Sequence, residues 1–151
     1  MQINNYLFTY GTLMQEFQTP VTDFLKQNTV FIGIAYAKGL LFDLGKYPAL
    51  VHIPNIEAEV RGNLFKITGD SVDLFKILDD YEGIRERFPT PYEYVRAIIP
   101  VQYREQKMES YTYLYNLPIN FKKLIPSGNY LDAVDFKLFS VNELMKVRKV
   151  V

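Results

Sequence analysis

The sequence predicts an α+β fold, a small mixed β-barrel with flanking helices, formed by a single domain over residues 1–151. Three observations lead to this prediction: a length of 151 residues, many short apolar runs, and few helical segments. A chain of this length buries roughly 68–70% of the surface that its unfolded form exposes. That is enough for one core, or for a closed sheet around a small pocket.

Short apolar or alternating runs bounded by Gly and Pro predict six strands. We expect them at Tyr6–Tyr10, Phe31–Tyr36, Leu40–Phe42, Ala58–Ile67, Tyr92–Tyr103 and Met108–Tyr115. Pro100 cannot donate to a ladder, so its strand is expected to be an edge or to contain a bulge. In the last strand, Tyr111, Tyr113 and Tyr115 share one face, where they either line a cavity or belong to the core.

Three segments have helical character: Pro20–Gln27, Asp70–Glu82 and Val141–Val150. The second has the strongest signals. Asp70 is suited to the N-cap, Leu74 and Leu78 fall on one face, and Gly83 is suited to the position just after the helix.

Composition excludes several kinds of site. The 17 basic and 17 acidic residues balance, so a long polyanion finds no strong attractive field and we expect no nucleic-acid partner. The absence of cysteine excludes disulfides, thiolate nucleophiles and cysteine-ligated zinc. The single histidine, His52, lies in a strand-like run where a structural role is more common than a catalytic one. We therefore expect no metal site.

The N-terminal region has no secretory pattern, because it lacks a basic segment, a long apolar segment and a small-residue cleavage site. No run of about 18 apolar residues occurs anywhere in the chain. These observations predict a cytoplasmic protein with no membrane partner.

The segment Tyr10-Gly11-Thr12-Leu13 follows the first predicted strand and carries the first chemical signal. Where a strand turns at glycine, the next backbone N–H groups lose their ladder partners and can converge on an anion. Such a nest binds a carboxylate or an oxyanion. The alternative is a plain turn in which Gly11 only relieves strain.

Glu82 lies at the carboxyl end of the second predicted helix and carries the second signal. The helix dipole is negative there, and Asp79 and Asp80 add like charge, so we expect a raised pKa that suits proton transfer. The alternative is a solvated residue that pairs with Arg85 or Arg87.

Further motifs occur in a fixed order between and after these two segments. The ordered set is Tyr10-Gly11-Thr12-Leu13, Gly39-Leu40-Leu41-Phe42, Tyr47-Pro48-Ala49-Leu50, Val60-Arg61-Gly62-Asn63-Leu64-Phe65, Leu78-Asp79-Asp80-Tyr81-Glu82-Gly83 and Tyr94-Val95-Arg96. In this order and spacing the chain resembles the gamma-glutamylcyclotransferase-like superfamily, particularly its AIG2-like members. The resemblance covers about Tyr6 to Tyr130.

The resemblance implies release of 5-oxoproline from a gamma-glutamyl compound, with no metal or organic cofactor. It implies that Tyr10, Gly11, Thr12 and Leu13 hold the gamma-glutamyl group, that Glu82 is the general acid and base, and that Tyr115 contacts substrate. Met14 stands where relatives often carry a basic residue, so a charge contact from that position is missing.

Three functions are consistent with these features. The first is an enzyme that cyclises gamma-glutamyl amines or small gamma-glutamyl peptides, in which the substrate's own α-amine is the nucleophile. The second is a non-catalytic binding or regulatory domain that holds a small carboxylate in the same pocket. The third is an interaction module with a tyrosine-rich surface. The sequence does not specify the leaving amine or the oligomeric state.

Overall fold

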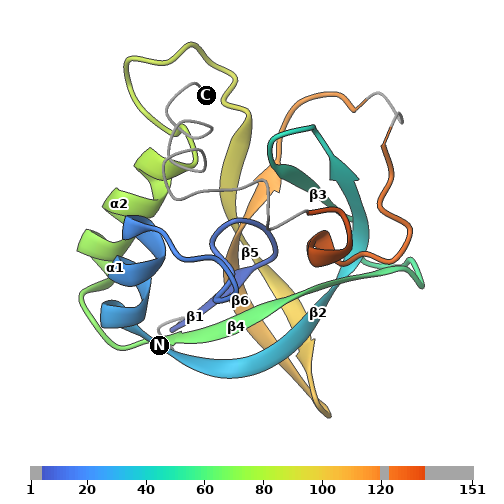
Figure 1. Ribbon diagram of the computed structural model, residues 1–151, viewed down its shortest axis with the longest axis horizontal. Coiled ribbons are helices and arrows are strands. Elements are labelled where there is room, and N and C mark those ends of the chain that lie inside the picture. The colour runs from blue at the N-terminus through green and yellow to red at the C-terminus, as the bar shows by residue number, and fades with distance from the viewer. Residues whose placement is uncertain (1–4, 120–122, 135–151) are drawn as a thin grey trace.

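The computed structural model describes residues 5–119 and 123–134. Along the chain the elements are β1 (Tyr6–Thr9), α1 (Pro20–Asn28), β2 (Thr29–Asp43), β3 (Pro48–His52), β4 (Glu59–Ile67), α2 (Ser71–Tyr81), β5 (Tyr94–Tyr103), β6 (Gln106–Tyr115) and the short 3₁₀ helix Tyr130–Asp132 (Figure 1). The helix expected at Val141–Val150 lies outside the described residues.

Five strands close into a barrel and a sixth extends it. The strand order is β3-β2-β4-β1-β6-β5, and an additional pairing between β2 and β5 closes the ring. All pairings are antiparallel except that of β1 with β6, where Leu7 lies opposite Tyr111. The predicted α+β class and mixed barrel are therefore confirmed. Pro100 lies on β5, the last strand in this order, and no bulge interrupts the β5–β6 register.

The two short strands expected at Phe31–Tyr36 and Leu40–Phe42 are one long strand, β2. Gly39 does not end it. A Cβ at this position would lie 2.2 Å from the carbonyl oxygen of Val51, so glycine is needed because β3 passes close by. The long β2 pairs with β4 along its first part and with β3 along its last part.

Helix α2 has the caps that its sequence predicts. The Asp70 side chain accepts hydrogen bonds from the N–H groups of Val72 (2.8 Å) and Asp73 (3.2 Å). Glu82 is the C-cap residue, and Gly83 follows in the left-handed region at φ 82°. The helix therefore ends in a defined way at Glu82, which fixes the backbone of that residue.

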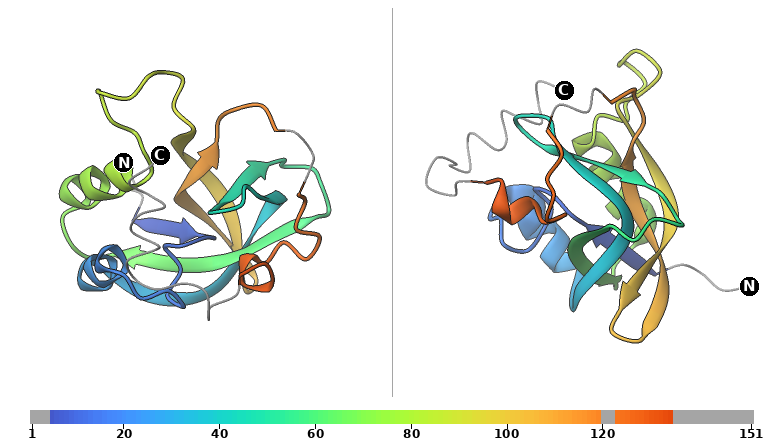
Figure 2. Two further views of the ribbon diagram at one scale, coloured as in Figure 1. Left: turned by 45° about the horizontal axis from the view of Figure 1, so that its top comes forward. Right: turned by 90° about the vertical axis from the view of Figure 1, so that its right-hand side faces the viewer.

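Two clusters of buried side chains make up the core. One fills the barrel interior and includes Phe8, Leu64 and Val101. The other, which includes Leu74 and Leu78, lies between the barrel and the two helices that cover it on one side (Figures 1 and 2). The ends of β1 and α2 therefore belong to one packed unit.

The tyrosine face of β6 belongs mainly to this second cluster. Tyr113 is buried, and Tyr111 packs against Phe75 of α2 with 4.6 Å between ring centroids. Arg96 lies over the Phe75 ring, 4.2 Å from its centroid. Within the described residues the face therefore does not form the exposed aromatic surface that an interaction module requires.

Candidate active site

The segment after β1 is a tight turn that lies inside the protein. Tyr10, Gly11, Thr12 and Leu13 are all buried, and the turn is closed by a hydrogen bond from the Met14 N–H to the Gly11 carbonyl (3.0 Å). Among the described residues, the N–H groups of Gly11 and Leu13 donate to no backbone or side-chain oxygen. The turn thus offers buried donors, as expected for an anion-binding nest.

The turn is held from two sides by side-chain hydrogen bonds. The Tyr10 hydroxyl donates to the carbonyl oxygen of Tyr113 on β6 (2.6 Å). The Thr12 hydroxyl lies 2.8 Å from the Tyr81 hydroxyl on α2, where either group can donate. Gly11 packs closely on Pro48 of β3, since a Cβ on Gly11 would lie 2.8 Å from the Pro48 Cγ. The donors of the turn are therefore fixed in position before any ligand binds.

Glu82 is a buried carboxylic acid, with 6% of its surface exposed. This differs from the solvated helix-end residue considered as the alternative. Arg85, one of the two partners considered for Glu82, instead pairs with Asp80, with 2.7 Å between the Arg85 Nε and an Asp80 carboxylate oxygen. Burial of a carboxylic acid beside buried N–H donors is typical of a functional site.

The two aspartates that precede Glu82 have cationic partners of their own. Asp80 pairs with Arg85, and Asp79 pairs with Arg96 at 3.2 Å. Each arginine offsets part of the negative charge that the helix end would otherwise direct at Glu82. The sequence predicts the like charge of these aspartates, but not that Arg85 and Arg96 pair with them.

Tyr113 was not among the residues proposed to bind substrate, yet it lines the cavity with Glu82. Its hydroxyl donates to a carboxylate oxygen of Asp79 at 2.6 Å. Burial raises the pKa of Tyr113, and the hydrogen bond to Asp79 and the charges of Asp79 and Glu82 raise this pKa further. The phenol is therefore neutral at every physiological pH and cannot act as a base.

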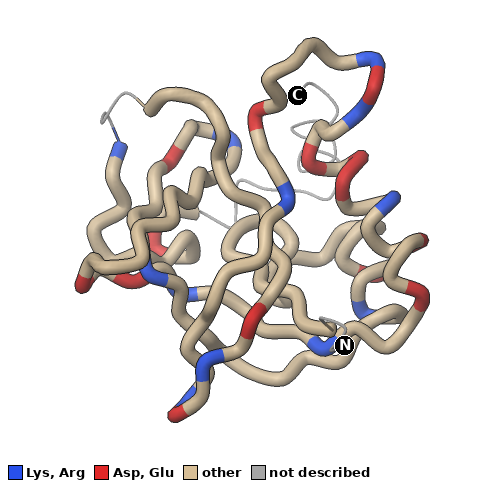
Figure 3. The backbone as a smooth tube through the Cα atoms, turned by 180° about the vertical axis from the view of Figure 1, so that it is seen from behind, with Lys and Arg blue, Asp and Glu red and all other residues tan. Residues whose placement is uncertain are grey.

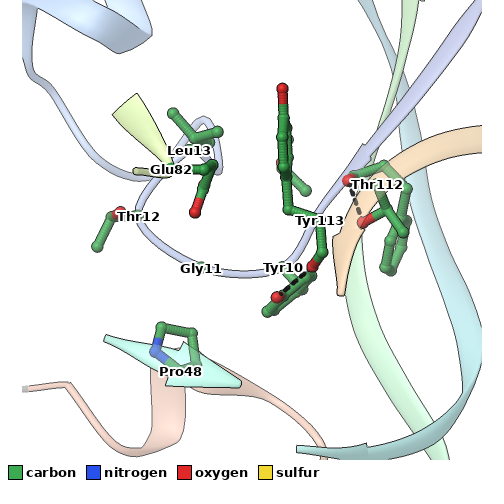
Figure 4. A pocket seen from close by; sticks show the side chains of 10 residues that line it. Tyr10, Gly11, Thr12, Leu13, Pro48, Glu82, Thr112 and Tyr113 are labelled. Atoms are coloured by element: carbon green, nitrogen blue, oxygen red, sulfur yellow. Dashed lines mark hydrogen bonds between the residues drawn. The ribbon is translucent and has the colours of Figure 1, made fainter. Parts of the chain in front are cut away.

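A narrow cavity separates the turn from Glu82. Its volume is ≈ 20 Å³, about what one water-sized group needs. Figure 4 shows the Glu82 carboxyl directed into the space above the turn, with Pro48 on the far side of Gly11. The residues that line it are Phe8, Thr9, Tyr10, Gly11, Thr12, Leu13, Pro48, Glu82, Thr112 and Tyr113. Two segments about seventy residues apart in the sequence thus meet at one cavity.

Tyr115 does not line this cavity. It lies two residues further along β6, where its ring packs edge-on against Tyr94 with 5.5 Å between centroids, and it lines a separate cavity with Phe42 and Lys123. Burial and the charge of Glu93 raise the pKa of Tyr115. The structure therefore brings Tyr10, Gly11, Thr12, Leu13 and Glu82 together at one cavity, where Tyr113 also lies and Tyr115 does not.

A larger groove adjoins the narrow cavity, and Glu82 lines both. The groove has a volume of ≈ 470 Å³ and is formed by the α2–β5 connection, the turn between β2 and β3, and the segment after β6. These three connections lie at the upper end of the molecule in Figure 1. Glu82 is therefore common to the narrow cavity and to the groove.

Acidic and basic residues are mixed along the described chain. Lys and Arg are interspersed with Asp and Glu along the side of the protein seen in Figure 3. The Nδ1 atom of His52 lies 2.8 Å from the carbonyl oxygen of Lys38, a contact that fits the structural role expected of this residue. Among the described residues no three His, Cys, Asp or Glu side chains are grouped as metal ligands, and no helix is long and apolar enough to cross a membrane.

Solved structures share this fold. The chain resembles an AIG2-like protein from Mus musculus at 20% identity and a TM-score of 0.55, covering 75% of this chain and 78% of that one. It resembles the protein YtfP from Escherichia coli at 26% identity and a TM-score of 0.50, with coverages of 85% and 97%. YkqA from Bacillus subtilis matches at 22% identity and a TM-score of 0.59 over 84% of this chain, which spans 39% of YkqA.

A comparison with curated proteins gave no match. The model of the family described as gamma-glutamyl cyclotransferase, AIG2-like, matches residues 7–132, which include the turn, Glu82 and every strand after the first residue of β1. The resemblance read from the ordered motifs is thereby confirmed. The chain belongs to the AIG2-like gamma-glutamyl cyclotransferase family.

Proposed function

We propose that this protein cyclises a gamma-glutamyl amine or a small gamma-glutamyl peptide, releasing 5-oxoproline and a free amine. The observation that carries the proposal is the meeting of Glu82 with the turn at Gly11 across one cavity. Glu82 is the one carboxylic acid among the described residues that line this cavity. Family membership supports the same reaction class.

The reaction needs a base that later becomes an acid. Glu82 takes a proton from the substrate's α-ammonium group, and the free amine then attacks the γ-carbonyl carbon to close a five-membered ring. The C–N bond to the leaving amine breaks as Glu82 returns the proton to that nitrogen, and the ring nitrogen loses its second proton to the released amine, which leaves as an ammonium ion. One buried carboxylic acid therefore performs both transfers, and no nucleophile from the protein is required.

The backbone donors of the turn supply the binding half of the mechanism. N–H groups held around Gly11 stabilise either the α-carboxylate of the substrate or the oxyanion that forms at the γ-carbonyl. Their anchoring to β6 and α2 lowers the cost of ordering them when substrate binds. The narrow cavity admits one such oxygen-bearing group at a time, so the rest of the substrate lies towards the groove.

The experiment is a 5-oxoproline release assay on a panel of gamma-glutamyl compounds. Glu82→Gln removes the proton-transfer group and keeps the shape of the side chain, so we expect kcat/KM to fall by a factor of about 100 or more. Glu86→Gln, which changes an exposed glutamate just after α2, is the matched control and is expected to keep full activity.

Two outcomes would contradict the proposal. Full activity of a folded Glu82→Gln variant would remove Glu82 from the mechanism. Tight binding of a gamma-glutamyl compound or another small carboxylate with no release of 5-oxoproline would instead favour the binding or regulatory domain.

A further inference from the structure

The groove beside Glu82 has a distinct chemical lining. It contains none of the four turn residues Tyr10–Leu13, although it shares Glu82 with the narrow cavity. Four residues of its wall have hydrocarbon side chains: Phe88, Pro89, Pro91 and Leu117. The groove has a volume of ≈ 470 Å³, which is within the size range of small-molecule sites.

The charges of the groove are few and opposite in sign. Besides Glu82, its lining holds Lys46 and Glu93. The Tyr47 hydroxyl donates to both carboxylate oxygens of Glu93, at 2.9 and 3.2 Å, so this carboxylate is already hydrogen-bonded within the protein. Apart from Glu82, which also lines the narrow cavity, the opposite charges of Lys46 and Glu93 balance, so the hydrocarbon wall is the main feature that distinguishes the groove.

Two arginines lie close to the Phe88 ring, and the Arg87 guanidinium carbon is 5.5 Å from the ring centroid. The Arg85 guanidinium carbon lies 5.0 Å from the ring centroid, and Arg85 is itself fixed by its ion pair with Asp80. This chain of contacts ties the wall of the groove to the end of α2, next to Glu82. These contacts therefore hold the apolar wall of the groove in a defined position next to Glu82.

Resting on the proposed function, we propose that the groove binds the leaving amine and that this amine carries a bulky apolar body, an aromatic ring above all. Glu82 must reach the leaving nitrogen to return its proton, so that nitrogen lies beside Glu82. The γ-glutamyl half of the substrate occupies the side of the turn. The amine substituent then extends into the groove and contacts Phe88 and Leu117.

Two pairs of substrates isolate the contribution of the ring. Gamma-glutamyl-phenethylamide and gamma-glutamyl-ethylamide differ only by a phenyl group, and gamma-glutamyl-phenylalanine and gamma-glutamyl-alanine differ in the same way. We expect kcat/KM to be about tenfold or more higher for the aromatic member of each pair, since even one buried methylene is worth about 10–200-fold. The second pair shows whether a carboxylate on the leaving group changes this preference.

Variants of the groove separate binding from intrinsic reactivity. Phe88→Ala removes part of the apolar wall and is expected to reduce the aromatic-to-aliphatic ratio about tenfold, while the rate for gamma-glutamyl-ethylamide changes little. Leu117→Trp instead fills part of the groove. We expect it to reduce the same ratio because less room remains for the aromatic ring of the substrate. Val72→Ala on the exposed side of α2 is the control and keeps the wild-type ratio. Thermal unfolding of each variant verifies that it is folded.

The possible failures are distinguishable. If no panel member releases 5-oxoproline, the proposed function fails and this inference fails with it. If release occurs but the ethyl and alanine compounds match or exceed their aromatic partners, the proposed function stands and the groove assignment is overturned. A preference for gamma-glutamyl-diaminopentane over gamma-glutamyl-pentylamide would also overturn it, because it would mean that the groove selects a cation.

Discussion

Tyr113 shows how strongly its surroundings determine the chemistry of one side chain. The same phenol would be a weak acid in water, but here it is buried, donates to Asp79 and faces the charge of Glu82. All three effects favour the neutral form and outweigh the charge of Arg96, which lowers this pKa. Tyr113 is therefore a neutral hydrogen-bond donor to Asp79 beside the cavity, and it does not compete with Glu82 for the proposed role of base.

This state of Tyr113 predicts a pH dependence of stability. Near pH 10 the phenol ionises in the unfolded chain while the folded protein retains its proton, so unfolding releases a proton and rising pH favours unfolding. The contribution of Tyr113 is complete below pH 10 and is lost progressively above it. We expect the free energy of unfolding of the wild type to fall more steeply than that of Tyr113→Phe, by about 1.4 kcal/mol in total between pH 9 and pH 11.

Urea unfolding of both proteins between pH 9 and pH 11 measures this difference in slope. The other tyrosines are common to the two proteins and cancel in the comparison. The loss of the bond to Asp79 lowers the stability of Tyr113→Phe at all pH values but does not create a slope. Parallel slopes for the two proteins would show that Tyr113 titrates like an exposed tyrosine.

The side chains of the site were predictable to different degrees. Glu82 and the turn at Gly11 are local signals, because helix ends and strand-ending glycines can be read from neighbouring residues. The choice between Tyr113 and Tyr115 is not local. Both face the same way on β6, and only the structure shows that Tyr113, which donates to Asp79, lines the cavity while Tyr115 packs against Tyr94.

Helix α2 and the turn after β1 act together through one buried contact. The hydroxyls of Thr12 and Tyr81 lie 2.8 Å apart and join the donor half of the site to the helix that ends at Glu82. Because Tyr81 immediately precedes Glu82, this contact sets the distance between the two halves. We expect loss of the Thr12–Tyr81 hydrogen bond to lower kcat/KM more than a mutation elsewhere that destabilises the protein by the same amount.

A double-mutant cycle tests this coupling. Thr12→Val and Tyr81→Phe each remove the shared hydrogen bond, and we expect each to lower the free energy of unfolding by about 0.5–1.5 kcal/mol and to lower kcat/KM. The double variant is expected to cost less than the sum of the single variants, since the bond is lost only once. Strict additivity in urea unfolding and in kcat/KM would contradict the coupling.

Elements with strong end signals were predicted well. Asp70 and Gly83 mark the two ends of α2 because capping depends on a few adjacent residues. The strand β2 was divided wrongly at Gly39, where glycine was taken as a break. Gly39 instead leaves space for the carbonyl oxygen of Val51 on β3. This is a contact between strands, which no local sequence pattern reveals.

The closed barrel accounts for the position of the site as a whole. β1 lies between β4 and β6, so the turn at its end is placed beside the side chains of β6, and α2 packs over the same part of the sheet. The parallel pairing of β1 with β6 joins positions about a hundred residues apart, such as Leu7 and Tyr111. The periodicity of the sequence predicted the mixed barrel, but it did not predict that β1 pairs with β6.

The central claim is that Glu82 and the backbone donors around Gly11 act on one bound molecule. A crystal structure of the protein with 5-oxoproline tests it most directly. We expect an oxygen of 5-oxoproline to accept hydrogen bonds from N–H groups of Gly11–Leu13, and the ring nitrogen, the former α-amine, to lie about 2.6–3.2 Å from the Glu82 carboxylate. A ligand bound elsewhere on the barrel, or bound at the turn with Glu82 directed away from the ring nitrogen, would contradict the account.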